Sequence, residues 1–229
     1  MRVLVLDSAL GRCAAAVVVD GAVAAARAET MRRGHAAVLP AMAREVLAEA
    51  GGALDLVGVT VGPGSFTGIR AGLALAHGIA LAAGVPVAGV TVGEAIAEAL
   101  PHLGVRELWV ATRGRRGHIF LERHAFLERI PTGRDGVIAS FPLAALPAAA
   151  GPVAVAGEAA NEVAARLAAR GTDVMLTDAR FAPPVPLAAV AARRQAGGVP
   201  PRPAQPVYVD PPEAHPPAGG LRPPPGPAA

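Results

Sequence analysis

Residues 55–90, DLVGVTVGPGSFTGIRAGLALAHGIALAAGVPVAGV, decide how this sequence folds. The stretch opens with a continuous apolar run, which is typical of a strand buried on both faces. A glycine-rich loop follows, then helix-forming residues to about Ala83, the strand VPVAGV and the helix GEAIAEAL. Strand, loop, helix, strand and helix in this order predict a parallel α/β layer.

Three shorter segments come before this stretch and predict an antiparallel start to the same sheet. RVLVLDS, CAAAVVVDG and VAAARAE read as strands, with Asp20 and Gly21 at the turn between the last two. The segment HAAVLPAMAREVLAEAGG predicts a helix that ends at its glycine pair, with Pro40 in a tolerable place near the first turn. Together these elements form a predicted N-terminal lobe over residues 1–103.

A second unit begins near Gly104 and is predicted as a smaller C-terminal lobe over 104–185. ELWVATR and HIFLERHAFLERI flank the turn GRRG and predict a hairpin, and GPVAVAGEAANEVAARLAARG predicts a strand followed by a helix. A short helix over 186–197 is expected to pack back on the N-terminal lobe. Residues 198–229 are rich in proline, so this tail is predicted to be extended or disordered except where QPVYVD docks.

The charge and cysteine content restrict the chemistry that the chain can carry out. All 21 basic residues are arginine, which excludes a Walker-type loop, Schiff-base chemistry and a lysine general base. The net charge is only +3, so the high isoelectric point is weak support for a polyanionic partner. The single cysteine, Cys13, excludes an internal disulfide and lies in a strand-like run, where we predict a buried, inert thiol.

The apolar segments predict neither a secretory signal nor a membrane span. Asp7 interrupts the first apolar run after a few residues. The uncharged run over 71–90 is broken by glycine, histidine and proline, which favours a helix, a turn and a buried strand. We therefore expect a soluble, cytoplasmic protein.

The glycine-rich loop allows two interpretations. A helix N-terminus preceded by glycines can bind a phosphate group, because its free N–H groups and the helix dipole favour an anion. The spacing of Gly62, Gly64 and Gly68 is one residue too long for the dinucleotide fingerprint, and no lysine follows. Gly64 can instead supply a positive-φ turn, with Ser65 or Thr67 capping the helix. The residues favour the turn over the phosphate site.

Asp7 raises the same question at the end of the first strand. An aspartate there, followed by a small hydroxyl residue and a hairpin turned by glycine, is typical of the phosphate and magnesium corner of actin-like and sugar-kinase-like ATPases. The segment LDSALGRCAAAVVVDG lacks the glycine that usually follows closely. The alternative is an aspartate that satisfies backbone amides at a turn. The candidate anion or nucleotide loop comprises Asp7, Gly62, Gly64, Ser65, Thr67 and Gly68.

The histidines do not form a metal-binding pattern. No two of the six lie three or four residues apart, as a zinc site on one helix requires. His118 and His124 can share one face of a strand. The simpler explanation is that this is the solvated face of a hairpin and not a metal site. GPGSF does not match the nucleophile motif G-x-S-x-G, and no Ser/His/Asp arrangement is evident. We predict no catalytic residue, no metal and no cofactor.

Two helices carry more apolar surface than one core-facing stripe requires. At about 100° per residue, Arg44, Glu45 and Glu49 confine the charges of the first helix to an arc of about 140°. The second helix has no charge after Arg70. One face can cover the sheet, and the other is expected to meet a second polypeptide unless the helix PLAAVAARRQ covers it. The predicted partner interface combines residues of both helices, namely His35, Val38, Leu39, Met42, Val46, Ile69, Leu73, Ala76 and Ala80.

These segments together resemble the TsaB (YeaZ) family. The resemblance rests on VLVLDSALGRCAAAVVVDG, HAAVLPAMAREVLAEAG, the GPGSFTG-hydrophobic-R run after a buried strand, and the late PVYV. It covers nearly all of the first hundred residues and then becomes weaker. It implies a two-lobed α/β fold of the actin/Hsp70/sugar-kinase class, with mixed sheets and flanking helices. The helices of the N-terminal lobe would then form a dimer interface.

The resemblance also implies a function. Members of this family are non-catalytic partners that dimerise with the catalytic subunit TsaD and act with the ATPase TsaE. The complex makes N6-threonylcarbamoyladenosine beside the anticodon of tRNA. By this resemblance the chain is a pseudo-enzyme that activates TsaD, forms a homodimer when alone and meets tRNA indirectly through the complex. The alternative is a small ATPase or kinase that uses Asp7 and the loop from Gly62 to Gly68.

The chain departs from the family pattern in two places. RGRRGHIF over 113–120 stands where the family tends to have DARRGEVY, and Asp210 follows PVYV where an arginine is commoner. The changes leave a basic cluster of Arg113, Arg115, Arg116, His118 and Arg123. This cluster either contacts tRNA phosphates directly or is a solvated turn.

Overall fold

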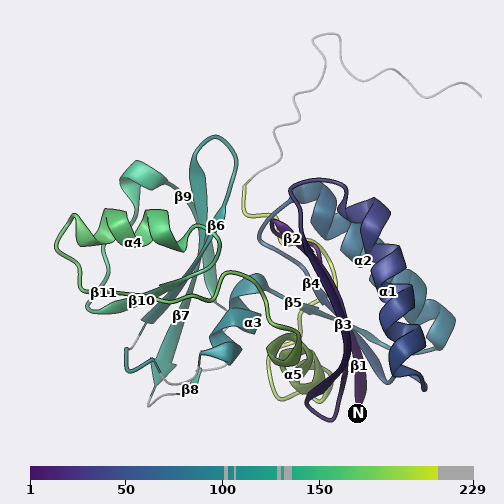
Figure 1. Cartoon of the computed structure of the whole chain (residues 1–229). Coiled ribbons are helices and arrows are strands. Elements are labelled where there is room, and N and C mark those ends of the chain that lie inside the picture. The colour runs from purple at the N-terminus through teal and green to yellow at the C-terminus, as the bar shows by residue number, and fades with distance from the viewer. Residues whose placement is uncertain (101–102, 106, 128–129, 132–135, 211–229) are drawn as a thin grey trace, which may run out of the picture.

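The computed structural model describes residues 1–100, 103–105, 107–127, 130–131 and 136–210, and two mixed sheets with flanking helices lie side by side in it (Figure 1). The predicted α/β class with mixed sheets is thus confirmed. We propose the boundary between the lobes near Gly104, before the first strand of the second sheet.

The first sheet has the strand order β3-β2-β1-β4-β5. Its strands are β1 (Arg2–Asp7), β2 (Arg12–Val19), β3 (Ala22–Thr30), β4 (Leu56–Thr60) and β5 (Val87–Val90). β1, β2 and β3 pair in antiparallel fashion, whereas β4 pairs in parallel with both β1 and β5. Asp20 and Gly21 both have positive φ, as the tight turn between β2 and β3 requires.

Successive side chains of β1 point to opposite faces of the sheet, so they belong to two different hydrophobic cores. Leu4 and Leu6 point to the face covered by α1 (His35–Ala50) and α2 (Phe66–Ala83). Val3 and Val5 point to the opposite face, where α5 (Pro184–Gln195) packs. Figure 1 shows α1 and α2 outside the sheet and α5 on its other side. The idea that the late helix covers the outer face of α2 is therefore wrong, because the sheet lies between them.

The second sheet has the strand order β11-β10-β6-β7-β8, and β9 pairs with β7. Its strands are β6 (Glu107–Arg113), β7 (His118–Leu127), β8 (Ile130–Pro131), β9 (Val137–Pro142), β10 (Val153–Ala156) and β11 (Val174–Leu176). The predicted β6–β7 hairpin and the strand-helix unit of β10 and α4 (Ala160–Ala168) are present. The strands β9 and β11 and the 3-10 turn Leu143–Ala145 were not predicted.

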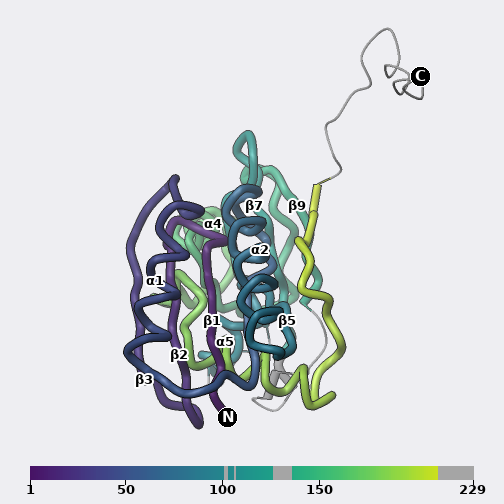
Figure 2. Tube along the Cα trace, turned by 90° about the vertical axis from the view of Figure 1, so that its right-hand side faces the viewer, coloured from purple at the N-terminus to yellow at the C-terminus, as the bar shows by residue number. Residues whose placement is uncertain are grey.

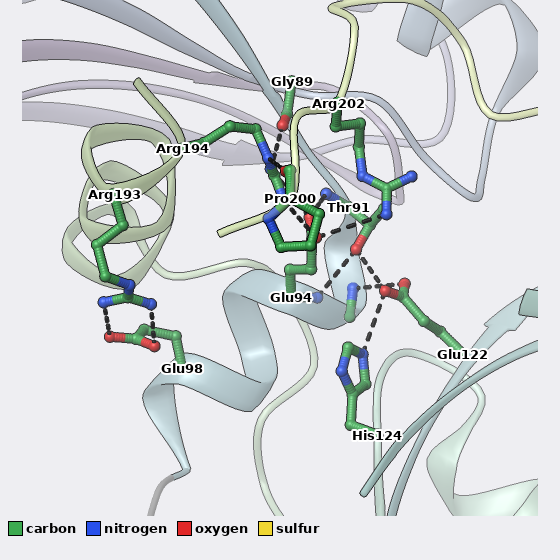
Figure 3. Close-up of polar contacts among 11 residues, drawn as sticks. Gly89, Thr91, Glu94, Glu98, Glu122, His124, Arg193, Arg194, Pro200 and Arg202 are labelled. Atoms are coloured by element: carbon green, nitrogen blue, oxygen red, sulfur yellow. Dashed lines mark hydrogen bonds and ion pairs between the residues drawn. The ribbon is translucent and has the colours of Figure 1, made fainter. Parts of the chain in front are cut away.

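The helix α3 (Val92–Ala99) lies between the two sheets and joins them through a polar network (Figure 3). The carboxylate of Glu122, fully buried on β7, accepts hydrogen bonds from the Thr91 hydroxyl and from the Gly93 N–H, the latter at 2.9 Å. His124 Nε2 lies 3.1 Å from Glu122 Oε1. A side chain of the second sheet thus holds the N-terminus of a helix that follows the first sheet.

A second part of this network ties α3 to α5. Glu94 accepts from Arg194 at 2.5 Å, and Arg202 Nη2 lies 3.5 Å from the same Glu94 oxygen. Burial raises the pKa of Glu94, but the hydrogen bond and charge of Arg194 outweigh burial, so the pKa lies below its ordinary value. Arg193 makes a bidentate pair with Glu98 on the exposed side. These pairs fix the start of the C-terminal segment beside α3.

Residues 199–210, which we call the C-terminal strap, form no helix or strand but dock against the N-terminal lobe. The Val207 N–H donates to the Val61 carbonyl at 2.9 Å, and a ring nitrogen of His77 lies 3.0 Å from the Ala204 carbonyl. Figure 2 shows the strap, in yellow, running along α2. The predicted docking of QPVYVD is confirmed, and the rest of the predicted tail, 211–229, lies outside the described residues.

Candidate functional site

The glycine-rich loop is filled by the chain itself. The Ser65 N–H donates to the Ala9 carbonyl at 2.7 Å, and the Ser65 hydroxyl accepts from the Gly68 N–H at 3.2 Å. A Cβ at Gly64 would lie 2.1 Å from the Ala9 carbonyl oxygen, and one at Gly68 would lie 2.1 Å from that of Ser8. The glycines therefore let the β1–β2 turn contact the start of α2, and Ser65 caps the helix as predicted.

Asp7 is buried and is held by neighbouring residues at the end of β1. Its carboxylate accepts from the Thr60 hydroxyl at 2.9 Å and from the Ala9 N–H at 3.2 Å, and it pairs with Arg12 at 3.4 Å. Arg12 is fixed in turn by the Ala182 carbonyl at 2.6 Å and by the ring of Phe181. A guanidinium thus stands beside this carboxylate, which supports a structural role for Asp7 rather than a role in binding magnesium and phosphate.

Cys13 is fully buried in β2. Burial, followed by the charges of Asp7 and Glu29, raises the pKa of its thiol to about 11. Both burial and the scarcity of thiolate oppose reaction with electrophiles.

We expect Cys13 to resist a maleimide at pH 8 in the folded protein, because only about one thiol in a thousand would be ionised there and none would be accessible. Intact mass spectrometry should find the native chain unlabelled after an hour and fully labelled in guanidinium chloride. Equal labelling rates in both conditions would contradict the burial of this strand.

The predicted basic cluster is divided by the structure. Arg113 pairs with Glu162, whose hydrogen bond raises the pKa of the guanidinium. His118 Nδ1 lies 3.1 Å from the Ser140 hydroxyl, so it does not join His124 at Glu122. Within the described part of the chain, no three His, Cys, Asp or Glu side chains come together as metal ligands do. Arg115, in the β6–β7 turn, extends toward Phe66 instead.

The residues predicted as a partner interface require a correction. Val38 is half-buried, and the structure buries the other eight inside the N-terminal lobe: His35, Leu39, Met42, Val46, Ile69, Leu73, Ala76 and Ala80. His35 even contacts the Leu10 carbonyl, at 3.0 Å. These side chains face the sheet and cannot contact a partner without unfolding the lobe. The prediction chose the inward stripe of two helices that are apolar on more than one side.

The opposite stripes of α1 and α2 are largely exposed and mainly apolar, although Arg44 lies on the α1 stripe and His77 beside the α2 stripe. We call them the outer α1–α2 face, which consists of the exposed residues Ala37, Ala74, Gly78, Leu81 and Ala82 and the half-buried residues Ala41 and Ala71. Leu81 is 86% exposed. The charges Glu45 and Glu49 lie to one side, where they pair with Arg27 of β3 at 3.0 and 2.7 Å. On α2 no charge follows Arg70, so the face is uncharged to the end of that helix.

The helix α2 is long and apolar enough to cross a membrane by length and composition alone, and it is the one such helix in the described residues. Its mean hydropathy is 1.4, yet only 33% of it is buried. Its inward stripe packs on the sheet of the N-terminal lobe. The unusual feature is therefore the amount of apolar helix surface that the chain leaves uncovered.

Comparisons with known proteins agree with the fold and with the sequence resemblance. Residues 26–171 match the family model described as TsaD, tRNA N6-adenosine threonylcarbamoyltransferase. The chain is 33% identical over 124 residues to the tRNA threonylcarbamoyladenosine biosynthesis protein TsaB of Escherichia coli, a match that covers 52% of this chain and 53% of that protein. The match thus spans about half the length of this curated relative.

A second curated protein and a solved structure are also similar to this chain. A tRNA N6-adenosine threonylcarbamoyltransferase of Ruegeria sp. is 45% identical over 65 residues, which cover 27% of this chain and 18% of that protein. The solved structure of YeaZ from Pseudomonas aeruginosa superposes with a TM-score of 0.73 at 27% identity, covering 90% of this chain and 99% of that one. The superposition shows that this chain has the fold of YeaZ over nearly its whole length.

Proposed function

Since the chain belongs to the family described as tRNA N6-adenosine threonylcarbamoyltransferase (TsaD), and within it to the TsaB (YeaZ) group, we propose that it serves threonylcarbamoyladenosine formation on tRNA. Its role is that of a subunit with no active site of its own, which dimerises with the catalytic TsaD subunit and activates it in the cytoplasm. TsaE is the third component, and tRNA is met through the complex.

The observation that carries this proposal is the outer α1–α2 face. Fully burying one leucine side chain stabilises an assembly by about 1.5–3 kcal/mol, and Leu81 is 86% exposed in the chain alone. Ala74 and Gly78 lie one turn apart, so a partner helix can approach this stripe closely. The occupant proposed is the corresponding pair of helices of TsaD.

Activation follows if docking selects one arrangement of the catalytic subunit. A partner that binds one conformation better than others shifts the population toward that conformation by its difference in affinity. The chain then needs no chemistry of its own. In the absence of TsaD, two copies can cover the same face in a symmetric homodimer, since a large apolar patch seldom stays exposed.

The rival function, a small ATPase or kinase, is less well supported by the geometry at Asp7. That carboxylate is already engaged by Thr60, the Ala9 N–H and Arg12. The Gly62–Gly68 loop is closed by the β1–β2 turn. A nucleotide would have to displace these contacts.

A reconstituted tRNA modification assay separates the two functions. We expect omission of this chain to abolish threonylcarbamoylation, and Asp7→Asn to retain more than about half of the activity. Asparagine keeps the shape and the Thr60 contact at a cost of about 1–3 kcal/mol in stability, so the folded fraction is checked by protection of Cys13 from maleimide. Loss of activity in a folded Asp7→Asn chain, together with loss of magnesium-dependent ATP binding, would favour the ATPase.

A further inference from the structure

Two arginines and two aromatic rings meet at the N-terminal end of α2. The Arg70 guanidinium lies 3.7 Å from the centroid of the Phe66 ring and donates to the Tyr208 hydroxyl at 2.7 and 3.1 Å. Arg115 approaches the same Phe66 ring, with 5.8 Å between its guanidinium carbon and the centroid. The centroids of Phe66 and Tyr208 are 6.2 Å apart. Three separate segments therefore build one cluster: α2, the C-terminal strap and the β6–β7 turn.

In the part of the chain that the structure describes, no carboxylate pairs with the positive charges of this cluster. Some exposed arginines pair with carboxylates, as Arg27 does with Glu45 and Glu49 and as Arg193 does with Glu98, whereas Arg166 and Arg170 donate to backbone carbonyls. Within the described residues, Arg70 and Arg115 form no ion pair, and their side-chain partners are the two rings and one phenol. Both guanidinium groups thus lack a carboxylate partner among the described residues, and each can still pair with an anionic ligand.

The rings of the cluster are accessible as well. Phe66 is 45% exposed and Tyr208 is 58% exposed, although both are large side chains that gain free energy from burial. Exposed aromatic rings next to arginines are the pattern by which proteins bind single-stranded nucleic acid, because bases stack on the rings while the arginines hold the phosphates. An acidic peptide would use the guanidinium groups but leave the rings exposed.

We propose that Phe66, Arg70, Tyr208 and Arg115 form a binding site for single-stranded RNA. The choice of RNA rests on the proposed function, but the binding belongs to this chain alone and does not need TsaD. Leu81 lies fifteen residues after Phe66 on α2, so the helical rise separates the two residues by about 20 Å. The RNA site and the outer α1–α2 face can therefore be occupied at the same time, so that this subunit holds an unpaired stretch of the tRNA near the complex.

The test measures fluorescence anisotropy of a labelled twelve-nucleotide single-stranded RNA with the full chain in 50 mM and 200 mM NaCl. We expect binding that weakens with salt, and at least roughly fivefold weaker binding for Phe66→Leu, which removes a stacking ring but keeps an apolar side chain. Arg115→Ala should weaken binding and reduce the salt dependence by about one phosphate contact. Arg166→Ala, on exposed α4, is the matched control and should bind as the wild type does.

A variant that binds RNA more tightly is an independent test, because misfolding would weaken binding rather than strengthen it. Asp210 is exposed and lies two residues beyond Tyr208, so Asp210→Asn removes a negative charge near the site and should strengthen RNA binding. The proposal is overturned if the RNA does not bind at 50 mM NaCl, or if Phe66→Leu and Arg166→Ala bind alike. Displacement of the RNA by poly-glutamate as readily as by unlabelled RNA would assign the cluster to an acidic protein instead. The omission assay with TsaD is independent of all these outcomes.

Discussion

Replacing Leu73 by glutamate is expected to unfold the chain. Leu73 is 5% exposed and packs in the core beneath α2. The substitution removes a buried leucine and places a carboxylate where no partner is available, which costs several kcal/mol for the charge alone. A domain of this size has about 5–15 kcal/mol of stability in total. Circular dichroism should show loss of the cooperative thermal transition, and Cys13 should become reactive to maleimide.

The neighbouring substitution Ala74→Glu is the matched control for this result. Ala74 is one residue further along α2 but lies on the exposed stripe, so its glutamate stays in water. This variant should keep the melting temperature within a few degrees of the wild type and keep Cys13 protected. A folded Leu73→Glu chain with unchanged stability would show that α2 is rotated relative to the arrangement described above.

Replacing Leu81 by glutamate is expected to leave the fold intact and to disrupt pairing with TsaD. The side chain is 86% exposed in the free chain, so the change costs little stability. In the proposed complex the same position is buried, and an unpaired carboxylate there should cost about 2 kcal/mol or more, as at interface hot spots. This corresponds to roughly thirtyfold weaker binding or more, which isothermal titration calorimetry measures directly.

The matched control is Leu176→Glu in β11. Leu176 is also a substantially exposed leucine, at 49%, but it belongs to the second sheet, far from the outer α1–α2 face. Its replacement should leave the affinity for TsaD unchanged. If the two variants lose affinity equally, or if only Leu176→Glu does, the partner docks elsewhere and the proposed interface is wrong.

The strands and helices of the N-terminal lobe could be predicted because their local patterns are strong. The uninterrupted apolar run of β4, the glycine pair after α1 and the proline-bounded β5 each indicate one element and its end. β9 and β11 were missed for a physical reason. β9 is a half-buried strand stabilised by its pairing with β7, and β11 has only three residues. Neither has a periodicity that local sequence could reveal.

The partner surface illustrates what periodicity alone cannot determine. A helix that is apolar on all sides does not indicate which stripe faces the sheet, so the prediction chose Leu73 where the structure exposes Ala74. Packing against the sheet fixes the orientation of α2, and this packing depends on contacts between residues far apart in sequence. The same applies to Glu122, whose buried carboxylate meets Thr91 and Gly93 of another element. A lone glutamate in a strand gave no signal of this role.

The site at the start of α2 was only partly visible in the sequence. Arg115 was included in a basic cluster, but its closest ring partner, Phe66, is 49 positions away, and Tyr208 comes from a segment expected to be mostly extended. Only folding brings the three together. The one available signal was the single tyrosine of the chain, in the QPVYVD segment that docks on α2.

Contact between the outer α1–α2 face and the catalytic subunit can be measured at a single position by cysteine protection. In Ala74→Cys the new thiol lies on this face, whereas in Ala165→Cys it lies on exposed α4, and buried Cys13 adds no background in either chain. Maleimide labelling is followed with and without an excess of TsaD, at a concentration low enough to avoid homodimers. We expect TsaD to slow labelling at position 74 by at least tenfold and to leave the rate at position 165 unchanged. Equal labelling at position 74 with and without TsaD, under conditions where the two proteins co-sediment, would contradict it.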